Sequence, residues 1–164
     1  MRIHLFLTAE AAVVIGFLAA QLQPVALAHC QVPSGIYDDA MRVTMLREDA
    51  TTIRKAVTSL ETMLEGQDHP LLGFNQGVRW IHEKDETATN IQRVVSDYFL
   101  TQRVKAVSSG SPGHATYLEQ LARMHALLVT AMKCKQNADL ASVDALDAAI
   151  EAIAGYYPPS NKGG

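Results

Sequence analysis

The spacing of apolar residues is the feature that most constrains the fold of this chain. In one segment they recur in alternating steps of three and four, at Val43, Leu46, Ala50, Ile53, Val57, Leu60 and Leu64. Such a stripe covers one face of an α-helix and is typical of a helix in a bundle or a coiled coil. We therefore expect a helix that begins near Asp38 or Asp39, where acidic residues suit a helix N-terminus, and that ends before Gly66.

Three further segments have helical spacing, and we expect helices over about 75–106, 114–135 and 142–154. The residues expected to face inward are Phe74, Val78, Ile81, Ala88, Ile91, Val95 and Tyr98, then Leu118, Leu121, His125, Leu128 and Met132, and finally Val143, Leu146, Ile150 and Ile153. The charged run 83–86 would also allow two helices with a bend. A Ser-, Gly- and Pro-rich loop at 108–113 precedes the third helix, and Ser142 is expected to cap the fourth.

No segment has the alternating pattern of a β-strand. Four helices joined by short loops predict an all-α fold, an antiparallel up-and-down four-helix bundle over 38–155, with a flexible tail over 156–164. Hydrophobic residues make up 48% of the 164 residues, enough for one core. The net charge of −3 does not suggest nucleic-acid binding, which calls for a basic surface. Two cysteines are too few for a disulfide framework.

The first 28 residues have the pattern of a secretory signal. Arg2 makes the start basic, an apolar segment follows over 11–20, and Ala26-Leu27-Ala28 has the small residues of a cleavage site. An uncleaved membrane anchor is the alternative. Cleavage after Ala28 would make the protein an exported one, periplasmic or extracellular, with no membrane attachment afterwards.

Cleavage at this position would also have a chemical consequence, because His29 would become the first residue. An N-terminal histidine offers a free α-amine and an imidazole to one metal ion. Cys30 adds a thiolate and, when deprotonated, its amide nitrogen. Residues 29–37 are expected to form a short hook around that metal, in which Pro33 fixes one φ angle and Gly35 permits positive φ.

The sequence HCQVPSGIY over 29–37 resembles the metal-binding hook of nickel superoxide dismutases, which reads His-Cys-x-x-Pro-Cys-Gly-x-Tyr. Further segments that look like the cyanobacterial branch of that family are 74–76, 79–80 and 98–103. The resemblance implies a four-helix bundle assembled as a homohexamer, with a nickel ion as cofactor and superoxide as substrate. It also implies that His29 and Cys30 are the metal ligands, that Pro33, Ser34 and Gly35 shape and support the hook, and that the catalytic Tyr37 stands over the open metal face.

The chain departs from the family pattern at two positions. Ser34 stands where the family has its second thiolate ligand, and Met45 stands where some members have a glutamate that supports the axial histidine. Thiolates are soft donors that make nickel easier to oxidise, so a site with one thiolate favours nickel less strongly. Copper(II) prefers tetragonal nitrogen sites and is therefore the alternative metal.

A third protein ligand would have to come from elsewhere in the chain. His82, beside Trp80, and His125, on the expected apolar stripe of the third helix, are the candidates, although a core histidine with a hydrogen-bond partner is the favoured interpretation of His125. His69 and His114 are expected in loops or caps. Cys134 is expected to be partly exposed and incidental.

Two functions follow from these residues. The first is an exported superoxide dismutase, which converts superoxide to O2 and hydrogen peroxide at a nickel or copper ion. The second is a non-catalytic exported protein that binds copper or nickel through the same residues. A third hypothesis is a structural helical bundle whose hook no longer binds metal.

Overall fold

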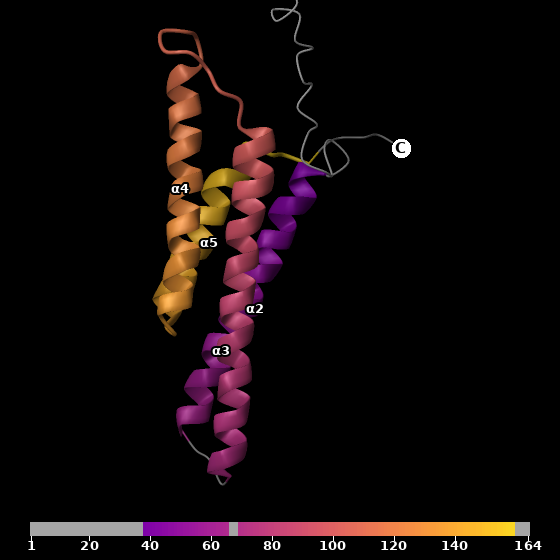
Figure 1. Cartoon of the computed structure of the whole chain (residues 1–164), viewed down its shortest axis with the longest axis vertical. Helices are drawn as coiled ribbons and strands as arrows, with labels where there is room; N and C mark the ends of the chain where they lie inside the picture. The colour runs from indigo at the N-terminus through magenta and orange to yellow at the C-terminus, as the bar shows by residue number, and fades with distance from the viewer. Residues whose placement is uncertain (1–37, 66–68, 160–164) are drawn as a thin grey trace, which may run out of the picture. The chain divides into compact units, whose positions relative to one another are not determined.

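The computed structural model describes residues 38–65 and 69–159, and within these ranges the secondary structure consists of helices joined by loops, with no strand (Figure 1). The expected leader and hook lie outside the described residues. In order, the elements are α2 (Asp39–Glu65), α3 (Pro70–Arg93), the π-helix η1 (Val94–Arg103) that continues α3, α4 (His114–Gln136) and α5 (Leu140–Ala154).

The helices pack in a ring, because α2 contacts α3 and α5, and α4 also contacts α3 and α5. The colours in Figure 1 run in alternating directions along successive helices, as in an up-and-down bundle. The predicted four-helix bundle is thus confirmed. Among the described helices, none has the length and apolar character needed to cross a membrane.

The core lies where all four helices overlap. The predicted stripe of α2 is buried from Val43 to Val57 and meets Ile91 and Val95 of α3 and η1. From α5 it receives all four predicted residues, Val143, Leu146, Ile150 and Ile153.

The far end of the α2–α3 hairpin is different, because it continues past the ends of α4 and α5 (Figure 1). Phe74, Val78 and Ile81 were expected to face the core, but they are about half exposed or more. Leu64 of α2 is exposed as well. The prediction of burial was wrong here because none of the other described helices covers this end of the hairpin.

The bounds of α3 also differ from the expectation. The helix begins at Pro70 rather than near Asn75, with proline in the first turn, where its missing N–H is not needed. It passes without a break through the charged run 83–86, because Lys84 turns inward and is buried. The helical backbone ends at Arg103 rather than Ala106.

The buried face of α4 is rotated from the expected one. Met124, Leu127, Ala131 and Cys134 are buried, whereas Leu118, His125 and Met132 are exposed. Apolar residues lie on several faces of this helix, so their spacing fits more than one stripe. The expectation of a core position for His125 was therefore wrong.

The start of α5 differs from the expectation by a few residues. Asp139, not Ser142, is the N-cap, and its carboxylate accepts the backbone N–H of Ser142 at 2.7 Å. Beyond the helix, Tyr157 lies in the segment expected to be a flexible tail. It is nevertheless buried, and its ring centroid lies 4.7 Å from that of Phe99.

Candidate metal centre

The hook residues His29, Cys30, Pro33, Ser34, Gly35 and Tyr37 lie outside the described residues, so their roles stay predictions. Tyr37 is bonded to Asp38, the first described residue. The part of the structure nearest to the hook along the chain is therefore the first turn of α2. The side chains around that turn are the described ones that follow the hook most closely in the sequence.

Asp38 caps this first turn. Its carboxylate accepts the backbone N–H of Met41 at 3.1 Å, and its carbonyl accepts the N–H of Arg42 at 3.0 Å. Capping by an aspartate satisfies an N–H that has no partner within the helix, and its charge suits the helix dipole. The chain therefore enters α2 in a defined way directly after the hook.

Asp39 connects the same turn to η1. One carboxylate oxygen accepts the hydroxyl of Tyr98, and the other accepts a guanidinium N–H of Arg103 at 2.5 Å. The Asp39 side chain is 20% exposed. Sequence reasoning treated Asp39 only as an acidic residue at a helix start, because nothing in the pattern pairs it with residues about sixty positions away.

Tyr98 is the buried member of this group, with 7% of its surface exposed. Its ring packs edge-on against Phe99, and the guanidinium of Arg42 lies 5.5 Å from its centroid. Burial, and then the hydrogen bond to the Asp39 carboxylate, raise the pKa of Tyr98 to about 12. The phenol therefore keeps its proton at neutral pH.

Met45 lies further along α2, on its exposed side. A guanidinium nitrogen of Arg42 lies 3.9 Å from its sulfur. The thioether is uncharged and only a weak acceptor, so it does not replace the carboxylate that the resemblance places here.

The histidines of the described helices do not form a second metal centre. His82 and His125 are both exposed, on α3 and α4 respectively. His69 precedes α3, and His114 opens α4 with its Nδ1 2.7 Å from the carbonyl oxygen of Val107. Within residues 38–65 and 69–159, no three His, Cys, Asp or Glu side chains are grouped as metal ligands would be. Ligation by His82 or His125 stays a prediction that would need the hook to reach them.

Cys134 is buried, which corrects the expectation of a partly exposed thiol. Its Sγ donates to the carbonyl oxygen of Ser142 at 3.3 Å. Burial raises the pKa of this thiol to about 11, although the nearby Lys84 lowers it in part. A buried, protonated thiol is a poor metal ligand and a poor partner for a disulfide with Cys30.

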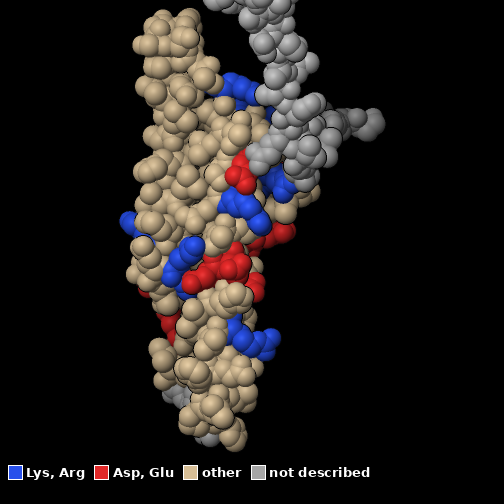
Figure 2. All heavy atoms as spheres, viewed as in Figure 1, with Lys and Arg blue, Asp and Glu red and all other residues tan. Residues whose placement is uncertain are grey.

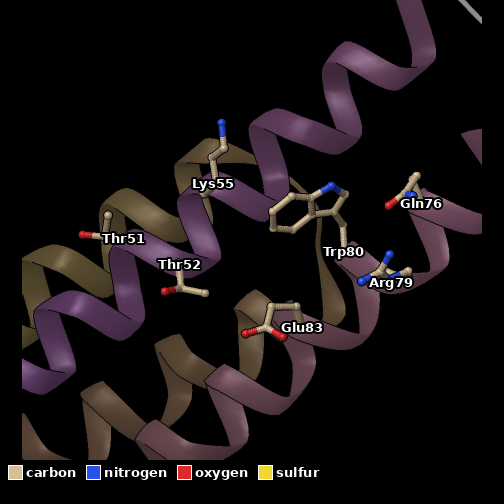
Figure 3. Close-up of a pocket in the computed structure, with 7 residues that line it drawn as sticks. All are labelled: Thr51, Thr52, Lys55, Gln76, Arg79, Trp80 and Glu83. Atoms are coloured by element: carbon tan, nitrogen blue, oxygen red, sulfur yellow. The ribbon is translucent and has the colours of Figure 1, made fainter.

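A hollow of about 580 Å³ lies between the middle of α2 and the first half of α3 (Figure 3). It is lined by Thr51, Thr52, Lys55, Gln76, Arg79, Trp80 and Glu83. The Trp80 indole lies between the two helices, and the Lys55 side chain points away from the hollow. The lining holds neither histidine nor cysteine, so it offers no soft metal donor.

Comparison with known proteins identifies the family. A family model described as nickel-containing superoxide dismutase matches residues 24–161, a stretch that includes the hook and all of α2 to α5. Searches of curated proteins and of solved structures gave no match. Because the family model spans most of the chain, the protein belongs to the nickel-containing superoxide dismutase family.

Proposed function

We propose that this protein is an exported superoxide dismutase whose redox metal is held by the mature N-terminus, at His29 and Cys30. The observation that carries the proposal is the family match, which contains the hook residues in sequence. The product pair would be O2 and hydrogen peroxide.

The donors present fit a nickel ion by their number and chemistry. His29 supplies an amine and an imidazole, and Cys30 supplies an amide nitrogen and a thiolate. Four nitrogen and sulfur donors from two adjacent residues suit the tetragonal geometry of Ni(II). The same donors suit Cu(II), which we keep as the alternative metal because Ser34 does not provide the second thiolate.

The bound metal would supply the one-electron oxidation and reduction that dismutation requires. The chain itself would attract the anion and provide protons. Arg42 lies in the first turn of α2, and its charge would draw a small anion toward the hook, whereas the charge of Arg103 is paired with Asp39. Tyr37 would stand over the open face and, with ordered water, be the nearest proton source.

Removal of the leader after Ala28 is part of the proposal, because only cleavage frees the α-amine of His29. In an uncleaved chain that nitrogen belongs to a peptide bond and is a much weaker donor. Export through the secretory route would thus both place the protein outside the cytoplasm and complete its metal site.

A homo-oligomer, a hexamer by family resemblance, is the assembly that we propose. Support comes from the exposed end of α3, where Leu71, Phe74, Val78 and Ile81 recur in steps of three, four and three. On the face that Figure 2 shows, the described part of the hairpin tip, at the lower end, has few charged side chains. A large exposed apolar surface is typical of an interface. Light scattering should find a lower oligomer for Phe74→Asp than for the wild type, and an unchanged mass would contradict this interface.

A second candidate function is an exported copper- or nickel-binding protein without turnover. It is favoured by Ser34, since one thiolate is a weaker aid to nickel oxidation than two.

Metal analysis of the mature protein, purified from an exporting host and assayed for superoxide removal, tests these proposals. About one nickel or copper per chain, with activity that rises with occupancy, supports the dismutase. Bound metal without activity supports the metal-binding protein. Absence of metal contradicts both.

A further inference from the structure

The first turn of α2 is fixed from two directions. Asp38 caps it within the chain, as described above. Across the bundle, Tyr98 and Arg103 each bind a different oxygen of the Asp39 carboxylate. We call this three-residue group the Asp39 clamp. Because both oxygens are bound, the position and orientation of the carboxylate follow those of η1.

The clamp depends on the π-helical geometry of η1. Tyr98 and Arg103 are five residues apart, and in an α-helix the neighbours on one face are three or four apart. A π-helix has hydrogen bonds between residues i and i+5, so residues five apart come close to the same face. The N–H of Val104 indeed donates to the carbonyl of Phe99 at 2.9 Å. Such segments are rare and occur frequently at functional sites.

The clamp is also more enclosed than a comparable ion pair on the same helix. Its buried phenol and largely buried carboxylate are screened less by solvent than surface charges are. By contrast, Arg47 of α2 pairs with Glu151 of α5 at 2.6 Å, with both side chains about half exposed. The Arg47–Glu151 pair therefore serves as a matched control that also joins α2 to another element.

The place of the clamp in the chain suggests its role. Asp39 follows Tyr37, the last residue of the hook, by two positions. We propose, on the basis of the metal-binding function proposed above, that Asp39 is a positioning residue for the hook. By holding the first turn of α2 against η1, the clamp sets where and in which direction the hook leaves the bundle. A ligand segment oriented in advance loses less freedom when it binds its metal.

The test compares nickel(II) binding by the mature, full-length wild type with that of Asp39→Ala and Glu151→Gln. Binding is measured by competition with a chelating indicator, and the thiolate-to-nickel absorption band reports the geometry at Cys30. We expect Asp39→Ala to bind nickel at least about tenfold more weakly and to shift the band, as is usual when groups that orient metal ligands are lost. Glu151→Gln should match the wild type in both readouts, and Asp39→Glu should restore much of the affinity.

Equal affinity and an equal band in the wild type and Asp39→Ala would overturn the inference alone. A wild type that binds no nickel would overturn the proposed nickel site and this inference with it. If Asp39→Ala does not fold, Arg103→Gln gives the same comparison, because Arg103 is partly exposed and lies at the end of η1. Wild-type affinity in that variant would also overturn the role of the clamp.

Discussion

The ammonium group of Lys84, in α3, donates to the main-chain carbonyl of Cys134 near the end of α4 at 2.5 Å. It also donates to the carbonyl of Lys135 at 3.0 Å and to the carboxylate of Asp85 at 2.8 Å. The Lys84 side chain is 3% exposed, so these three acceptors replace its lost hydration. Carbonyls at a helix C-terminus lack partners within the helix and carry partial negative charge. Lys84 thus ties α3 to the end of α4.

Replacing Lys84 with methionine should therefore destabilise the bundle. The apolar side chain fills similar space but leaves two carbonyls of α4 without their donor, at a cost of about 3 kcal/mol. Urea unfolding at a fixed protein concentration measures the loss as a lower midpoint. The control is Lys133→Met, since Lys133 is exposed on the same turn of α4, and its effect should stay within about 0.5 kcal/mol. Equal midpoints for the two variants would argue against the role of Lys84.

Cys134 should react slowly with thiol reagents in the folded protein. With a pKa of about 11 in place of 9.0, its thiolate fraction at neutral pH is roughly a hundredfold lower, and burial limits access further. In a Cys30→Ala variant Cys134 is the sole thiol, so the release of a coloured thiol from a disulfide reagent reports on it alone. The reaction should be slow in buffer and fast in denaturant. A fast reaction in buffer would show that Cys134 is accessible.

Tyr98 gives a pH dependence whose sign follows from its raised pKa. Its folded value is about 12, against 10.0 for an ordinary tyrosine. The stabilisation is fully present below pH 10 and is lost as pH rises toward 12, because the unfolded chain ionises first. Tyr157, whose pKa is likewise raised to about 12, contributes in the same direction. The free energy of unfolding should therefore fall between pH 10 and 12, and less steeply in Tyr98→Phe. Identical slopes would contradict the assignment to Tyr98.

Ser34→Cys should create or increase nickel-dependent superoxide removal. The substitution supplies the second thiolate, a soft donor that makes nickel easier to oxidise, and we expect at least about a tenfold gain per bound nickel. Ser108→Cys, in the exposed loop before α4, adds a thiol that is not part of the hook sequence and should bring no gain. A gain in both variants would point to adventitious metal binding instead.

The parts of the fold that were predicted correctly are those in which one helix face meets the rest of the chain. The stripe of α2 from Val43 to Val57 and the four inward residues of α5 are buried as expected, because each has a facing helix in the same bundle. The stripe of α3 has equally regular spacing, yet Phe74, Val78 and Ile81 are exposed. Periodicity identifies an apolar face but does not say which element, or which chain, covers it.

The surroundings of the candidate site were less accessible to sequence reasoning. The hook residues are adjacent in the sequence, so their capacity to bind a metal could be inferred from the sequence alone. Asp39, Tyr98 and Arg103 come together only through the bundle and through a π-helix, for which the sequence has no periodic signal. Lys84 was interpreted as one member of a charged run, although it is the one that turns inward.

The central claim is that the free N-terminus of His29 is a metal ligand. The most direct measurement compares two otherwise identical chains, one that begins at His29 and one that begins at Ala28, for nickel content and superoxide removal under the same loading conditions. The account predicts about one metal ion per chain and activity for the chain that begins at His29, and the loss of both when the single alanine precedes it. Equal metal content and equal activity in the two chains would contradict it.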